Sequence, residues 1–234
     1  MLNTVHVIEH HNWPTDAGQT HLASLGFDVR VHHVWRGEPL PTLTGDEAGV
    51  LTMGGPQMVS EHEKWPYLAD EFRLIEDALK RDIPLVGVCL GSQIIAHVLG
   101  APVTYADDPK AMSMGFYETR SLDEAFMPTT LMTLNGNSQG WDLPTGATLL
   151  ATSDQTIHPN QAFAYGDTVL ALQFHPEVTP EIFDVWHGEF GHLVGRPGTQ
   201  TRDEQLAGFE RWQAEARTWY RQTLERYLPV QATA

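Results

Sequence analysis

Residues 84–91 read Pro-Leu-Val-Gly-Val-Cys-Leu-Gly, and the cysteine in this stretch, Cys89, is the only one among 234 residues. Pro84–Val88 is a short apolar run typical of a buried strand, and the residues after Cys89 have the apolar spacing of a helix. A nucleophile on a sharp strand-to-helix turn, with a glycine two residues away on either side, is the nucleophile-elbow arrangement, here with Cys in place of Ser. The helix N-terminus adds about half a positive charge beside the sulfur, which favours the thiolate. The stretch therefore predicts an α/β fold and a cysteine nucleophile.

The overall composition narrows the classes of function. The net charge of −16 argues against nucleic-acid and anionic-membrane partners, because both require a basic face. A single cysteine excludes an internal disulfide and a cysteine-rich metal site. The N-terminus has neither a basic region nor a long apolar stretch, and no run approaches the roughly 20 apolar residues of a membrane helix. We therefore expect a cytoplasmic protein.

Strand and helix patterns alternate through the first half of the chain, and the second half is richer in strands. The predicted strands are Val5–Glu9, Phe27–Val34, Gly49–Met53, Pro84–Val88, Val103–Tyr105, Phe116–Ser121, Leu131–Leu134, Thr148–Thr152, Ala162–Tyr165 and Val169–Phe174. The predicted helices are Gly18–Leu25, Tyr67–Arg81, the helix after Cys89, Pro180–His187 and Arg202–Leu228. This order predicts an open, mostly parallel central sheet with helices on both faces, which binds ligands at the carboxyl ends of its strands.

One domain, residues 1–234, is the economical interpretation, with a core over 1–190 and a C-terminal loop and long helix over 191–234. The apolar stripe of the last helix contains Leu206, Phe209, Trp212, Trp219 and Leu224. This stripe would pack on the core or form a homodimer interface. If Trp212 and Trp219 are exposed, it would dock another partner.

A cysteine nucleophile needs a base, and the base needs an orienting group. Among the twelve histidines, His175 stands out because it follows the predicted strand Leu170–Phe174, at the sheet edge where Cys89 also lies. Glu177, two residues later, can hold one ring nitrogen of His175 while the other nitrogen faces the sulfur. Pro176 fixes the backbone between them.

Amide chemistry also needs N–H donors for the oxyanion that forms during acyl transfer. The N–H of Leu90, directly after the nucleophile, is one expected donor. The second would come from the Gly54-Gly55-Pro56 loop after the third strand, because glycine lets the backbone approach closely. Taken alone, this loop is as well explained as an ordinary turn.

Two histidine pairs, His10-His11 and His32-His33, raise the question of a metal site. Adjacent residues of a strand point to opposite faces, so neither pair makes a chelate by itself. We expect no metal and no cofactor.

Three stretches closely resemble the class I glutamine amidotransferases, in particular stand-alone proteins similar to the amidotransferase domain of GMP synthase. They are Leu51–Val59, Pro84–Ala96 and Gln173–Val178, and weaker matches cover Gly37–Pro41, Trp141–Pro144 and Gln161–Phe163. The resemblance runs from the N-terminus to about residue 190, with the motifs in the order of the family. It implies the flavodoxin-like fold of that family.

The resemblance also implies a role for each matching residue. Cys89 would form a γ-glutamyl thioester with release of ammonia, His175 would act as base and then as acid, and Glu177 would orient it. Gly55 and Leu90 would donate to the oxyanion. The residues that would contact the substrate are Gly54, Pro56, Gln93, Gly115, Asn137 and Ser138.

Two segments depart from the family pattern. Where relatives often read Glu-Ile-Gly-Trp, this chain has Ser113-Met114-Gly115-Phe116, and a usual Trp-His-Gly-Asp segment is replaced within Gly136–Gly140. These segments would frame the amino and carboxylate groups of the substrate. Three functions therefore stay open: a glutaminase that supplies ammonia to a separate acceptor protein, a γ-glutamyl peptidase or other amide hydrolase with the same triad, and a non-enzymatic binding protein.

Overall fold

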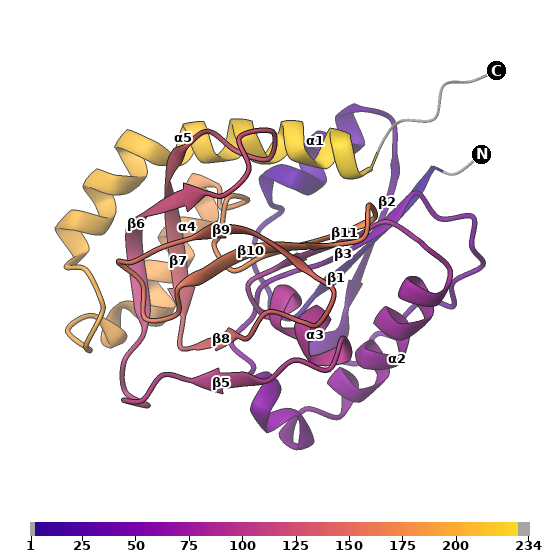
Figure 1. The fold of residues 1–234 in the computed structure, drawn as a ribbon, viewed down its shortest axis with the longest axis horizontal. Coiled ribbons are helices and arrows are strands. Elements are labelled where there is room, and N and C mark those ends of the chain that lie inside the picture. The colour runs from indigo at the N-terminus through magenta and orange to yellow at the C-terminus, as the bar shows by residue number, and fades with distance from the viewer. Residues whose placement is uncertain (1–2, 229–234) are drawn as a thin grey trace.

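The computed structural model describes residues 3–228, and its centre is a nine-stranded sheet in the order β2-β1-β3-β4-β11-β10-β9-β6-β7 (Figure 1). The strands of this sheet are β1 (Thr4–Glu9), β2 (Asp28–His33), β3 (Gly49–Thr52), β4 (Leu85–Val88), β6 (Ser113–Ser121), β7 (Thr130–Asn137), β9 (Thr148–Thr152), β10 (Asn160–Tyr165) and β11 (Val169–Leu172). A separate two-stranded sheet pairs β5 (Val103–Tyr105) with β8 (Gln139–Trp141).

The strands from β2 to β11 in this order are parallel, and the strands beyond β11 continue the sheet in antiparallel fashion. In the parallel part, Thr52 pairs with Gly87 and Val88 pairs with Leu172. The loops that follow β3, β4 and β11 therefore leave the sheet at the same edge, side by side. This register brings three distant sequence motifs together.

Helices cover both faces of the sheet. Figure 1 shows α1 (Ala17–Ser24) and α5 (Arg202–Tyr227) on one face and α2 (Pro66–Lys80) and α3 (Leu90–Val98) on the other. Each face has its own apolar core, and α4 (Pro180–Phe190) packs a third cluster against β6 and β7. Short 3-10 helices lie at Val34–Arg36, Val59–Lys64 and Gly191–Leu193. The predicted fold class, including the additional C-terminal helix, is confirmed.

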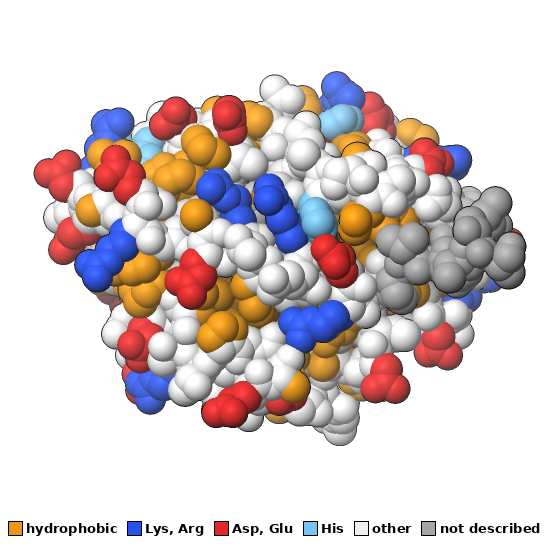
Figure 2. Space-filling model, turned by 90° about the horizontal axis from the view of Figure 1, so that it is seen from above, with side chains coloured by type: hydrophobic (Ala, Val, Ile, Leu, Met, Phe, Trp, Pro, Cys, Tyr) orange, Lys and Arg blue, Asp and Glu red, His pale blue; other side chains and the backbone are white. Residues whose placement is uncertain are grey.

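Helix α5 begins with a capping box between Thr201 and Glu204, and its inner face packs on the sheet. Trp219 is buried, but Leu206, predicted in the apolar stripe, is 40% exposed. The inner face of the helix contains Gly208, where a Cβ would approach the Phe116 ring. Leu206 lies two residues before Gly208, and because two residues turn a helix by roughly 200°, Leu206 points away from the sheet. Charged side chains of both signs are scattered over the face of the molecule seen in Figure 2. Residues 229–234 of the predicted C-terminal segment lie outside the described residues.

The two segments that depart from the family pattern lie in strands rather than loops. Strand β6 begins at Ser113 and β7 continues to Asn137, so both strands are longer than predicted. At these ends the residues are polar or glycine, so the apolar alternation that indicates a strand is missing from the sequence. The two strands nevertheless continue there because Ser113 pairs with Asn137. Within residues 3–228, no helix combines the length and apolar character needed to cross a membrane.

Candidate active site

Cys89 occupies a strained turn between β4 and α3. Its backbone has φ 50° and ψ −105°, a conformation that non-glycine residues rarely adopt. The turn is held because the Cys89 N–H donates to the Leu172 carbonyl at 2.7 Å and the Gly91 N–H donates to the Met53 carbonyl at 3.1 Å. A Cβ on Gly91 would lie 2.0 Å from the Thr52 carbonyl oxygen. The close approach of β3 to α3 therefore requires glycine and fixes the position of the sulfur.

His175 and Glu177 form a buried pair beside Cys89. The Nδ1 atom of His175 lies 2.8 Å from Oε1 of Glu177, which leaves Nε2 for the sulfur. Burial lowers the pKa of His175, but the Cys89 sulfur and the Glu177 carboxylate raise it more, and the result is a pKa of about 10. The ring also packs edge-on against Trp186, with centroids 4.6 Å apart. The structure thus brings together the three residues predicted as a triad.

The glycine loop after β3 lies directly against this pair. A Cβ on Gly54 would lie 2.8 Å from Cε1 of His175 and 3.7 Å from Cβ of Cys89. Gly55 and Leu90 both line the cavity above the sulfur. As the first residue of α3, Leu90 has a backbone N–H without an intrahelical acceptor. These two backbones are therefore placed where N–H donors for an oxyanion are needed.

A buried histidine, His10, supports the glycine loop from behind. Its Nε2 lies 2.7 Å from Glu71, which also accepts a hydrogen bond from Thr52 at 2.6 Å. Burial lowers the pKa of His10, but the Glu71 carboxylate raises it by more, so the pKa lies above its ordinary value. The His10 carbonyl accepts from Gln57, the residue after Pro56. His10 therefore has a structural role: its side chain binds Glu71 and its backbone binds the loop through Gln57.

The loop that carries His175 and Glu177 is held by two segments far away in the chain. On one side, the Ala17 N–H at the start of α1 donates to the Glu177 carbonyl at 3.0 Å. On the other, Nε2 of Gln213 on α5 lies 3.2 Å from the carbonyl oxygens of both His175 and Val178. Gln213 is fully buried. Sequence reasoning missed this residue because a glutamine within a helical pattern carries no signal of its contacts.

Asp16, the N-cap residue of α1, is a second buried carboxyl near Glu177. Its Oδ1 accepts hydrogen bonds from the backbones of Gly18 and Gln19. Burial raises the pKa of Asp16 to about 7, and the negative charge of Glu177 contributes to this rise. Burial also raises the pKa of Tyr220 on α5, which faces the same two carboxyls. Glu177 of the triad thus lies near two further buried acidic side chains, Asp16 and Tyr220.

A cavity of about 180 Å³ opens in front of Cys89 and His175, which is room for roughly a dozen water molecules. Of the residues predicted to contact substrate, Pro56, Gln93, Asn137 and Ser138 line it. Gln93 is fixed by a hydrogen bond from its Nε2 to the Gln139 carbonyl, and Asn137 donates to the same carbonyl.

Two predicted contact residues do not line the main cavity. Gly54 packs behind His175, as described above. Gly115 faces away because alternate residues of β6 point to opposite faces, so Met114 lines the cavity while the side chain of Gln200 fills the space at Gly115. Gln200 also bonds to both backbone groups of Phe116.

Three further lining residues, Met114, Gly136 and Gln139, belong to the two segments predicted to frame the substrate. The sequence did not single out the remaining ones, which are Trp13, Gln57, Met58, Met112, Trp186, Phe190, Leu193 and Arg196. They come from the loop after β1, the loop after β3, the residue before β6, helix α4 and the segment after it.

With this geometry in place, the chain can be compared with known proteins. A family model described as "Glutamine amidotransferase class-I" matches residues 15–186. The chain belongs to this family. The predicted relationship is therefore confirmed, and residues 187–228, including α5 and part of the cavity wall, lie outside the match.

Individual relatives agree with this assignment. The chain is 29% identical to the glutamine amidotransferase-like protein YfeJ of Salmonella typhimurium, covering 96% of this chain and 93% of that protein. It is 30% identical to the glutamine-hydrolysing GMP synthase of Bacillus subtilis over 64% of this chain, but spans only 28% of that enzyme. A glutamine amidotransferase structure from Thermotoga maritima matches 98% of this chain and 100% of its own, with a TM-score of 0.85 and 27% identity. One from Methylobacillus flagellatus has a TM-score of 0.89 over 100% of this chain and 98% of its own at 22% identity, which supports the fold.

Proposed function

We propose that the protein hydrolyses the side-chain amide of glutamine, or of a compound built on glutamine, through a thioester on Cys89. The observation that carries this proposal is the convergence of Cys89, the His175–Glu177 pair and the Gly54-Gly55 loop on one cavity. The glycine loop, Cys89 and the His175–Glu177 pair come from three separate parts of the sequence. A packing role for Cys89 would not require the strained backbone at this residue.

In the first half-reaction, the sulfur of Cys89 attacks the amide carbonyl carbon and a carbon–sulfur bond forms. The N–H groups of Gly55 and Leu90 stabilise the oxyanion. The raised pKa of His175 keeps a proton on its ring at neutral pH, and this proton passes to the leaving nitrogen as the carbon–nitrogen bond breaks. Ammonia leaves, and the acyl group stays on sulfur.

In the second half-reaction, water attacks the thioester. The imidazole of His175, now neutral, takes a proton from this water, and Glu177 stabilises the imidazolium that forms. Collapse of the second oxyanion releases the carboxylic acid and regenerates the sulfur–imidazolium pair. The ammonia either escapes to water or passes to a separate acceptor protein.

The test is ammonia release by the purified chain from L-glutamine and from N-acylated glutamines, combined with mass spectrometry of Cys89 for a trapped acyl group. We expect the Cys89→Ala variant to lose activity by at least about 10³-fold, with an unchanged melting temperature. An equally active and folded Cys89→Ala variant contradicts the mechanism. If no amide releases ammonia and no adduct forms on folded protein, the chain is a binding protein of this fold. Comparison with γ-glutamyl dipeptides tests the peptidase alternative.

A further inference from the structure

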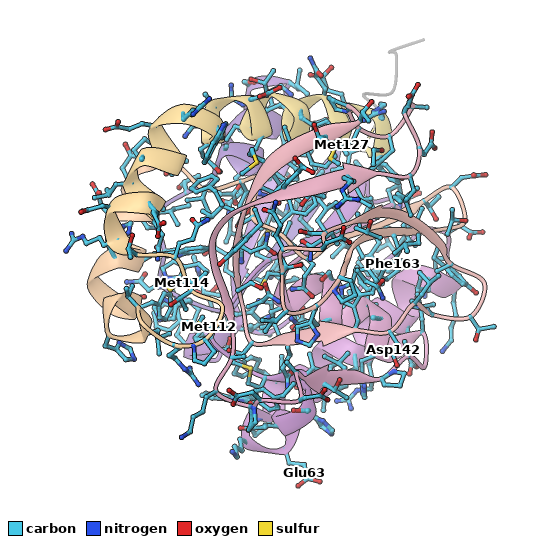
Figure 3. All side chains as sticks on the ribbon, turned by 60° about the vertical axis from the view of Figure 1, so that its left-hand side comes forward. Glu63, Met112, Met114, Met127, Asp142 and Phe163 are labelled. Carbon is cyan, nitrogen blue, oxygen red and sulfur yellow. The ribbon has the colours of Figure 1, made fainter. Side chains whose placement is uncertain are left out.

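The wall of the cavity differs in chemistry from its catalytic floor. Apolar side chains dominate the wall: Trp13, Met112, Met114, Trp186, Phe190 and Leu193. Figure 3 shows Met112 and Met114 near each other beside the ribbon of the C-terminal part. Such a wall binds an apolar group, because each carbon it covers is removed from water.

The aromatic part of the wall is a connected cluster that reaches the catalytic histidine. The ring centroids of Trp13 and Trp186 are 5.3 Å apart, and Phe190 lies 6.3 Å from both. Trp186 then packs on His175. An apolar substituent seated on these rings would therefore lie next to the reacting carbonyl. Side chains locked in an edge-to-face cluster offer a rigid surface with little ordering cost.

The charged side chains that line the cavity are cationic. Arg196 stands in the wall, and within residues 3–228 no carboxylate lies within 4.0 Å of its guanidinium. The other cationic side chain in the lining is the protonated ring of His175, which lies beside Cys89. The cavity lining contains no Asp or Glu in the described part of the chain. A carboxylate is matched by the guanidinium of Arg196, whereas an ammonium group would meet like charge.

We propose that the substrate is an N-acylated glutamine, or an amide of the same chemical class, in which an apolar acyl group caps the α-nitrogen. The α-carboxylate pairs with Arg196, and the acyl group lies on Trp13, Phe190 and Leu193. Free glutamine binds poorly because its ammonium has no acidic partner. This inference rests on the proposed function and names the substrate of the same site.

The first experiment is a binding measurement on the Cys89→Ala variant, which separates recognition from chemistry. Isothermal titration compares L-glutamine, N-acetyl-L-glutamine and N-phenylacetyl-L-glutamine. We expect affinity to rise in this order, with the phenylacetyl compound at least about tenfold tighter than glutamine. Glutamine binding as tightly as the phenylacetyl compound, or no detectable binding of the latter, overturns the inference. Failure of the proposed function instead shows as absent ammonia release by the wild-type chain.

The second experiment tests the carboxylate contact. Replacing Arg196→Gln should weaken binding of N-phenylacetyl-L-glutamine about tenfold, Arg196→Lys should weaken it less, and neither should affect the methyl ester of the same compound. The matched control is Arg202→Gln, an exposed arginine at the start of α5. An equal effect of Arg196→Gln on acid and ester, or no effect on either, contradicts the role of Arg196.

Discussion

The two halves of the catalytic site are held in place in different ways. Cys89 is fixed by a short continuous segment, β4-turn-α3, together with the backbone of the adjacent strands. His175 and Glu177 lie on a loop that is fixed by α1 and α5, elements at opposite ends of the chain. The nucleophile thus sits on one continuous segment that is held by the backbone of neighbouring strands, whereas its base is held by two helices far apart in the chain. The following substitutions test this difference.

The largest effect is expected at Gly91. In the Gly91→Ala variant, the new methyl group would lie 2.0 Å from the Thr52 carbonyl oxygen, which is backbone and cannot move without shifting β3. We expect a loss of at least about 4 kcal/mol in the free energy of unfolding, or no folded protein. Urea unfolding followed by circular dichroism provides the measurement.

The control for this variant is Gly188→Ala, in helix α4, where a Cβ would meet no atom within 4 Å. Alanine should be tolerated here, with a change within about 1 kcal/mol. If both variants unfold like the wild type, the elbow is not rigidly held by the neighbouring backbone.

Asp16 gives an intermediate, pH-dependent effect on the other half of the site. An unfolded aspartate ionises near its ordinary pKa of 3.8, but the folded Asp16 keeps its proton up to about pH 7. Between these values the folded state binds more protons, so stability falls as the pH rises and stays lower above pH 7. Asp16→Asn retains the N-cap and removes this loss.

We therefore expect Asp16→Asn to gain on the wild type by up to about 3 kcal/mol between about pH 5 and pH 8, measured as the free energy of unfolding in urea. The exposed Asp203 in the first turn of α5 is the matched control, since Asp203→Asn should leave the pH profile parallel to that of the wild type. A parallel profile for Asp16→Asn would show that the carboxyl ionises normally.

The smallest effect is expected for Gln213→Leu, which removes the side-chain donor shared by the carbonyls of His175, Pro176 and Val178. Unpaired buried carbonyls should cost about 1–3 kcal/mol of stability. We also expect ammonia release to slow about tenfold, because the imidazole shifts relative to the sulfur. Glu215→Gln, an exposed change on the same helix, should alter neither quantity. A Gln213→Leu variant with wild-type turnover would show that α5 does not hold the catalytic residues in place.

Much of the fold followed from local patterns. The alternation of apolar strands and amphipathic helices predicted the parallel part of the sheet, because buried parallel strands are continuous apolar runs. The ends of β6 and β7 were predicted too short, since Ser113 and Asn137 are polar and only their mutual pairing extends the ladder. Leu206 was assigned to the wrong face because a helical pattern cannot reveal which side a glycine such as Gly208 opens for close packing.

The sequence by itself determined the family, the strands and helices up to the elbow and the three candidate catalytic residues, since a tight turn and a strand end leave local signatures in residue type. The tertiary structure decided which side chains surround the sulfur. Trp13, Met114, Phe190 and Arg196 come from four separate segments that meet at one cavity. Neither their proximity nor the support of His175 by Gln213 has a local signature, because each contact joins residues far apart in the chain and depends on how the helices pack on the sheet.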